Sequence, residues 1–186
     1  MYLPLSHTAK TIRKNLRTLC EALGTSYDPS EDEARAEQAL LHAKEMLGET
    51  EIAIDYTATP APMSLARCLL EHGFRVTRIY ADSIAADDQE AFCWLQEHAP
   101  DIELYATVQV KLRVLPRETE KPTLAIGQKA AYFTGTKHFV NIVEGGGMYG
   151  FDGLRRLAEL MEEAYRTERD ARDFIQQKGL GCDSCL

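Results

Sequence analysis

Short runs rich in β-branched and aromatic residues alternate with amphipathic stretches between residues 51 and 143, and this alternation constrains the fold most strongly. The strands that it predicts cover residues 51–56, 75–80, 102–105, 123–127 and 139–143. Helices are predicted at 62–72, which Gly73 ends, and at 87–98. Residues 108–115 alternate like a strand, yet they occupy a position where a crossover helix would fit, so both interpretations stay open. Strands separated by helices imply right-handed crossovers and a parallel sheet.

Helical patterns flank this alternating region on both sides. Apolar residues recur at helical spacing before Gly24, and they are Ile12, Leu16, Leu19, Cys20 and Leu23. Ser30 and Glu33 form the pattern of a capping box before a second helix at 31–47, which Gly48 ends. The candidate inner positions of this second helix are Ala34, Leu40, Leu41, Ala43 and Leu47. A long amphipathic helix is predicted at 150–177.

These patterns together predict a three-layer, Rossmann-like α/β domain with a parallel sheet of four to five strands. N-terminal helices and a long C-terminal helix complete it. The expected organisation is an N-terminal helical segment at 1–48 that packs on the domain, the α/β domain at 49–178, and a flexible tail at 179–186.

The composition excludes several classes of protein. The 186 residues carry a formal net charge of −8, which disfavours binding to nucleic-acid phosphates. No stretch approaches the roughly 20 apolar residues of a membrane span, and the N-terminus lacks the apolar core of a signal peptide. We therefore expect a cytoplasmic protein that binds neither membrane nor nucleic acid.

The five cysteines do not form the pattern of a disulfide framework, because their number is odd and their spacing irregular. Cys68 and Cys93 lie in apolar helical patterns and are expected to be buried. Cys182 and Cys185 form a CxxC pair, which could be a redox pair or half of a metal site and makes them weak metal candidates. One such pair cannot complete a tetrahedral site without further ligands.

Ligands of parallel sheets bind beyond the carboxyl ends of the strands, and several polar residues are predicted there. Thr57 and Thr59 follow the first strand; they could form a hydroxyl-lined wall beside a ligand, or a structural turn in which Thr59 caps the next helix. This turn lacks the GxGxxG fingerprint of dinucleotide sites. Asp82 is interpreted as a turn former. Gln128 and Lys129 could bind an anionic group, or Lys129 could simply be solvated.

The stretch VEGGGMYGFDG at 143–153 is the most informative of these loops. Gly145, Gly146 and Gly147 lack Cβ atoms and so permit positive φ and close approach of the backbone to a ligand. The helix that follows presents unpaired N–H groups, which favour an anion, and Asp152 could cap it. A tight turn without a ligand is the alternative interpretation.

The same segments resemble the last domain of nitrogenase component 1-type proteins. The resemblance rests on AIGQ at 125–128, FVN at 139–141 and above all EGGGMYGFDGL at 144–154, and it extends to the N-terminal LPLSHTAKTIRKNLRTLCEALG and to EIAIDYTATPAPMSLARCLLEHGFRV. The family comprises the molybdenum–iron protein subunits, cofactor-assembly scaffolds and dark-operative protochlorophyllide reductase subunits. The resemblance implies a domain of such an oxidoreductase or assembly subunit.

The resemblance also implies a cofactor, partners and site residues. An iron–sulfur or related metallocluster belongs to the full-length assembly, with none bound by this domain alone. The partners implied are a homologous or identical component 1 subunit in an oligomer and an ATP-dependent iron–sulfur reductase. The residues expected around the pocket are Gly145, Gly146, Gly147, Tyr149, Thr57, Thr59, Gln128 and Lys129.

No residue is expected to be catalytic, and the isolated chain is expected to be inactive. The histidine that ligates the cofactor in the molybdenum–iron subunit aligns with Val140 or Asn141 here, which argues against a catalytic subunit of that kind. The alternative is a ligand-binding or subunit-pairing α/β module without redox chemistry.

Overall fold

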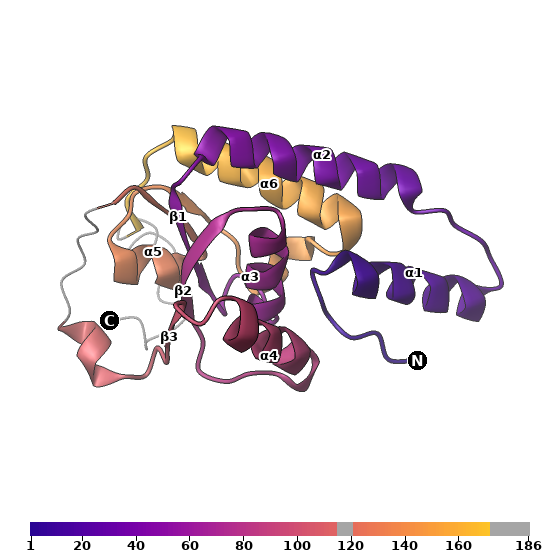
Figure 1. Cartoon of the computed structure of the whole chain (residues 1–186), viewed down its shortest axis with the longest axis horizontal. Coiled ribbons are helices and arrows are strands. Elements are labelled where there is room, and N and C mark those ends of the chain that lie inside the picture. Colours follow the sequence, from indigo (N-terminus) through magenta and orange to yellow (C-terminus); the bar gives the residue numbers. More distant parts are fainter. Residues whose placement is uncertain (115–120, 172–186) are drawn as a thin grey trace.

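The computed structural model of the chain describes residues 1–114 and 121–171, and Figure 1 shows how their elements are arranged. The strands in these residues are β1 (Glu51–Asp55), β2 (Arg75–Tyr80), β3 (Glu103–Tyr105), β4 (Thr123–Ile126) and β5 (Phe139–Val140). The α-helices are α1 (Ala9–Leu23), α2 (Ser30–Leu47), α3 (Pro62–Glu71), α4 (Gln89–His98), α5 (Gln128–Thr134) and α6 (Gly150–Arg166). Three 3-10 turns of the described chain are η1 (Ala86–Asp88), η2 (Val110–Arg113) and η3 (Glu144–Gly147).

The strands form one parallel sheet in the order β3-β2-β1-β4-β5. β1 lies at its centre and is buried along its whole length. Ile52 and Ile54 face the larger core, which α3, α4 and α6 cover, while Ala53 faces a smaller core beneath α5. The sheet therefore has helices on both faces, and the predicted three-layer, Rossmann-like class is confirmed.

The N-terminal helices are attached to the outside of α6. α2 runs alongside α6, and both cross the top of the view in Figure 1, whereas α1 projects to one side of the molecule. The apolar stripe of α6, which includes Leu154, Leu157 and Met161, is buried in the larger core. No helix in the described parts of the chain is both long and apolar enough to cross a membrane.

Several helix ends were predicted correctly. Gly24 ends α1 in the left-handed conformation, at φ 63°, and Gly48 ends α2. Pro62 occupies the first turn of α3, where its missing N–H costs nothing. Three of the five inner positions predicted in the second helix are buried: Leu40, Ala43 and Leu47.

The predicted start of α2 is wrong. Ser30 is the first residue of the helix rather than its cap, and its N–H donates to Asp28 Oδ1 at 3.0 Å. Ala34 and Leu41 are exposed, and Ala36 takes the inner position instead. The residue that precedes the helix is Pro29, which carries no side-chain acceptor, so a capping box cannot form there.

Three further predictions differ from the structure. Within 108–115, the described residues form η2 rather than a strand or a crossover helix, and 115 lies outside the described residues. The helix predicted at 150–177 corresponds to α6, which ends at Arg166, and 172–186 lie outside the described residues. Cys68 is buried as predicted, but Cys93 is exposed. The proposed segment boundaries at 48 and 178 stay predictions.

Candidate functional site

The order of the strands places a topological switch point at the centre of the sheet, between β1 and β4. β1 continues into α3 on one face, while its neighbour β4 continues into α5 on the other face. The loops after these two strands therefore diverge, and open α/β sheets bind ligands at such a switch point. Thr57 follows β1, and Gln128 and Lys129 begin α5 directly after β4, so the structure brings these three predicted residues to one place.

Asp55, at the end of β1, ties the two diverging loops together. Its carboxylate is completely buried and accepts hydrogen bonds from the N–H groups of Thr57 (2.7 Å), Ala58 (3.2 Å) and Ala130 (2.7 Å). The Thr57 hydroxyl also donates to it. Burial raises the pKa of Asp55, although these hydrogen bonds act in the opposite direction. Because Ala130 belongs to α5, Asp55 fixes the start of that helix against the loop after β1.

Gly127 allows the Asp55 carboxylate to occupy this position. Its φ of 108° is one that side chains rarely permit, and a Cβ placed on it would lie 2.3 Å from Asp55 Oδ2. The site therefore requires glycine here for two reasons, conformation and space.

Lys129 is buried at the switch point and not solvated. Its side chain is only 2% exposed, and its ammonium donates to the Tyr56 hydroxyl and lies 4.3 Å from the centre of the Tyr56 ring. The positive charge of Lys129 also acts on Asp82, which lies just after β2. Although burial acts in the other direction, hydrogen bonds from Thr107 and the charge of Lys129 lower the pKa of Asp82. A positive charge thus lies beneath the carboxyl ends of β1 and β2.

Asp82 and Gln128 connect neighbouring strand ends. Asp82 accepts hydrogen bonds from the Thr107 N–H (2.6 Å) and hydroxyl (2.7 Å), which joins the loops after β2 and β3. The Gln128 amide donates to Asn141 Oδ1 at 2.7 Å, which joins the start of α5 to the residue after β5. The polar side chains of this edge thus form a connected network.

The glycine loop lies against the same edge. The Gly145 N–H donates to the Ala58 carbonyl at 2.8 Å, which places η3 beside the loop after β1. Gly145, Gly146 and Gly147 have φ of 78°, 52° and 77°, as their predicted role requires. A Cβ on Gly145 would lie 2.7 Å from the Tyr149 hydroxyl, so the half-exposed Tyr149 ring folds back over this loop.

Thr59 is separate from this group. Its hydroxyl is buried, lies 2.9 Å from His7 Nε2 and accepts a hydrogen bond from the Ala61 N–H at 3.2 Å. It makes no cap of α3, because that role belongs to Asp88, which accepts from the N–H groups of Met63 (2.8 Å) and Ser64 (2.7 Å). Asp152 likewise forms no side-chain cap of α6 and instead pairs with Arg155.

The predicted metal candidates are not among the residues that the structure describes. Cys182 and Cys185 lie outside the described residues. Across residues 1–114 and 121–171, no group of three His, Cys, Asp or Glu side chains is placed to hold a metal ion. The loops of the switch point contain neither cysteine nor histidine and offer hydroxyl, amide, ammonium and backbone N–H groups instead.

Sequence reasoning missed Asp55 and Tyr56. The signal for Asp55 was present, since its carboxylate directly follows the apolar residues 52–54 of the central strand and must find donors there. One of its partners is the Ala130 N–H of α5, a segment that was not predicted as a helix.

Comparison with known proteins supports the fold. Neither the family models nor the curated proteins compared with this chain give a match. Among solved structures, the chain is similar to nitrogenase Cp1 at pH 6.5, with a TM-score of 0.59 and 17% sequence identity. The match covers 97% of this chain and 41% of that chain, so the sequence spans about two fifths of the nitrogenase chain. The chain therefore has a nitrogenase-like α/β fold.

Proposed function

We propose that this chain acts as a domain of a nitrogenase component 1-like oxidoreductase or cofactor-assembly subunit. In that role the carboxyl edge of the sheet forms one wall of a metallocluster or substrate pocket, and the domain is not catalytic alone. The observation that carries the proposal is the convergence of Thr57, Gln128, Lys129 and the glycine loop 145–147 at the β1–β4 switch point. The similarity in fold over nearly the whole chain supports it.

The chemistry of these residues suits the wall of a pocket rather than a set of metal ligands. A metallocluster supplies the redox chemistry when it is bound, and the protein supplies shape and electrostatics. The buried Lys129 ammonium contributes positive charge, and the glycines allow close approach of backbone N–H groups. Because the loops offer no thiolate or imidazole, the metal ligands would come from another part of the assembly. In keeping with the family resemblance, we propose a component 1 subunit and an ATP-dependent iron–sulfur reductase as its partners.

Binding by the glycine loop is tested with Gly146→Val. A Cβ at Gly146 would lie 3.2 Å from Ile142 Cγ2 and 3.3 Å from Met148 Cε, and the φ of 52° is one that β-branched residues rarely adopt, so valine strains the loop there. We expect a titration of the purified chain with protoporphyrin IX, an organic ligand that needs no metal ligand from this domain, to show weak binding by calorimetry. Gly146→Val should weaken it at least about tenfold, equivalent to about 1.4 kcal/mol.

Gly24→Val is the matched control, because Gly24 also has a positive φ of 63° but lies at the end of α1 with no atom within 4 Å of its Cβ position. Equal affinities for protoporphyrin IX in wild type and Gly146→Val, or no binding of it by wild type, would contradict the pocket wall. Turnover by the purified chain alone would contradict its non-catalytic role.

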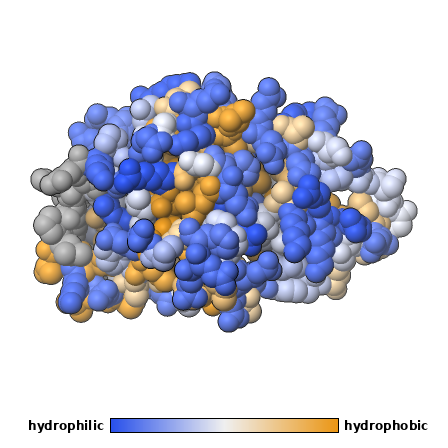
Figure 2. All heavy atoms as spheres, in the orientation of Figure 1, coloured by the Kyte–Doolittle hydropathy of each residue, from blue (hydrophilic) through white to orange (hydrophobic). Residues whose placement is uncertain are grey.

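A subunit-pairing module is the second candidate, and one observation favours it. Val108, Val110 and Val114 are each more than two-thirds exposed around η2, and apolar atoms are visible at the lower left of Figure 2, where η2 lies in Figure 1. Exposed apolar patches often mark interaction sites. Sedimentation of wild type and Val110→Glu tests this second candidate. Pairing through this surface predicts that wild type is a dimer and that the variant is a monomer. A wild-type monomer at high concentration would exclude self-pairing.

A further inference from the structure

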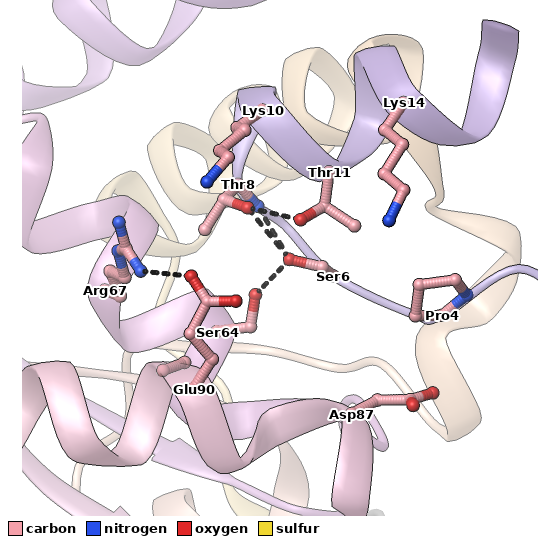
Figure 3. Close-up of a pocket in the computed structure, with 11 residues that line it drawn as sticks. Pro4, Ser6, Thr8, Lys10, Thr11, Lys14, Ser64, Arg67, Asp87 and Glu90 are labelled. Atoms are coloured by element: carbon pink, nitrogen blue, oxygen red, sulfur yellow. Dashed lines mark hydrogen bonds and ion pairs between the residues drawn. The ribbon is translucent and has the colours of Figure 1, made fainter.

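A polar cavity lies away from the switch point, between the N-terminal segment, the first turns of α1, and the helices α3 and α4 (Figure 3). Its volume is about 200 Å³, and it shares no lining residue with the switch point. Three basic side chains line it, together with four hydroxyl groups and two carboxylates. The basic residues are Lys10, Lys14 and Arg67.

The acidic side chains of the cavity are already engaged, whereas the lysines are not. Arg67 pairs with Glu90 at 3.6 Å and also with Glu71 at 2.9 Å. The Asp87 carboxylate accepts from the Tyr2 hydroxyl and from the Leu5 N–H, and in Figure 3 it points away from Ser64.

Lys10 and Lys14 form no ion pair with any residue that the structure describes. They lie four residues apart on one face of α1, where like charges repel. The first turn of α1 contains no acidic residue to offset them. The cavity is therefore lined by two ammonium groups of α1 that pair with neither of its carboxylates, Asp87 and Glu90.

Four hydroxyl groups form a chain along the cavity wall, and its direction can be assigned. Thr8 donates to Thr11 at 3.1 Å, so Thr8 must accept from Ser6, 3.0 Å away. Ser6 then accepts from Ser64 at 2.8 Å. Each hydroxyl has one proton, so the chain runs from Ser64 to Thr11.

The proton of Thr11 is the one left over, since no group among the described residues accepts it. Thr11 lines the cavity between Lys10 and Lys14 in sequence, and Figure 3 shows all three side chains on the same wall. A spare hydroxyl donor beside two ammonium groups is suited to an acceptor-only ligand.

We propose that this cavity binds a small dianion of the phosphate class through Lys10, Lys14 and the Thr11 hydroxyl. A phosphate group carries nearly two negative charges at neutral pH and only acceptor oxygens around most of its surface, which matches two unpaired ammonium groups and one spare proton. The volume is below the roughly 300–1,000 Å³ of drug-sized ligand pockets. The cavity therefore admits inorganic phosphate or a small phosphate monoester, and not a nucleotide.

The test is a titration of the ¹⁵N-labelled chain with inorganic phosphate at low ionic strength, followed by amide chemical shifts. We expect saturable shifts at Lys10, Thr11 and Lys14 in wild type. Charge-assisted hydrogen bonds are stronger than neutral ones. Lys10→Gln and Lys14→Gln should therefore each weaken binding at least about tenfold, and Thr11→Val should weaken it several-fold.

Arg17→Gln is the control, because it removes the same charge from an exposed position on α1 that does not line the cavity. It should bind phosphate as wild type does, apart from a small effect that salt screens. Methyl phosphate distinguishes the two sources of the ligand: tighter binding than inorganic phosphate assigns the cavity to a monoester, and weaker binding assigns it to the free ion. Unsaturable wild-type shifts, or equal weakening by Arg17→Gln and Lys14→Gln, overturn the proposal. The spectra themselves show whether each variant is folded.

Discussion

Gly127→Ala is expected to destabilise the fold by at least about 3 kcal/mol. Two costs combine in this variant. A backbone at φ 108° and ψ 158° is nearly restricted to glycine, and forcing another residue into it costs on the order of 1–3 kcal/mol. The new Cβ would also lie 2.3 Å from Asp55 Oδ2, in a place where the carboxylate is held by donors from two loops and cannot retreat. Overpacking of this kind costs about 1–3 kcal/mol.

Gly73→Ala separates the two costs. Gly73 has a φ of 78°, but a Cβ there would meet only Lys44 Cε, at 3.9 Å. Gly73→Ala should therefore lose only the unfolding free energy that comes from backbone conformation, about 1–2 kcal/mol. Urea unfolding of both variants gives the comparison. Equal losses of stability in the two variants would show that Asp55 does not fill the space beside Gly127.

A double variant identifies Asp55 as the cause. Asp55→Ala removes the atoms that the new Cβ meets, and it also leaves buried N–H groups without an acceptor, at a cost of roughly 1–3 kcal/mol. If the clash is the main term, Gly127→Ala with Asp55→Ala should lose clearly less stability than the sum of the single variants. A purely additive result would assign the whole effect of Gly127→Ala to its backbone conformation.

The sheet could be predicted from the sequence because its signals are local. The central strand Glu51–Asp55 contains the apolar run 52–54, and the helices between the strands carry clear apolar periodicity and glycine ends such as Gly73. Fold class follows from that alternation alone. The positive φ angles of the loop at 145–147 could also be predicted, because glycine is the residue that adopts them readily and three glycines are consecutive there.

The parts that were missed depend on contacts distant in sequence. α5 has only seven residues, too few for a periodic pattern, and it starts at a bond from Ala130 to Asp55, far away in the chain. Val108 and Val110 alternate like strand residues, but the sheet ends at β3 and they are exposed instead. The cap of α3 comes from Asp88, a residue of η1 rather than one next to the helix.

That same region contains two titratable groups with opposed effects on stability. His7 and Asp88 are both buried and both bond to Ser64: the His7 N–H donates to its hydroxyl at 2.8 Å, and Asp88 accepts from its N–H at 2.7 Å. Burial lowers the pKa of His7 from 6.5 to about 4. Burial, with a smaller contribution from the charge of Asp87, raises the pKa of Asp88 from 3.8 to about 6 against the pull of its two hydrogen bonds.

The signs of the two effects follow from proton binding. The unfolded chain binds a proton at His7 more readily than the folded chain does, so stability from His7 is present above pH 6.5 and is lost as the pH falls towards about 4. At Asp88 the folded chain binds the proton more readily, so stability is present below pH 3.8 and is lost as the pH rises through about 6. Each shift corresponds to about 3 kcal/mol, as an order of magnitude.

In the wild-type chain the two effects on the free energy of unfolding should therefore largely cancel between about pH 4 and 6.5. As the pH changes, the stability that one group contributes rises while the stability that the other contributes falls. His7→Gln, whose amide can replace the bond from Nε2 to Thr59, removes only the first effect. Relative to wild type, we expect this variant to gain up to about 3 kcal/mol of unfolding free energy as the pH falls across this window. Asp88→Asn should instead gain a similar amount relative to wild type as the pH rises.

Urea unfolding of wild type and both variants at several pH values across this window measures the two differences. Taking each variant relative to wild type cancels the titration of all the other carboxylates, which would otherwise dominate the pH dependence of an acidic chain. The opposite slopes of the two variants serve as each other's control, because a general loss of packing around Ser64 would shift both curves without tilting them. Slopes of the same sign, or no slope in either, would mean that the His7 and Asp88 side chains reach solvent in the folded protein.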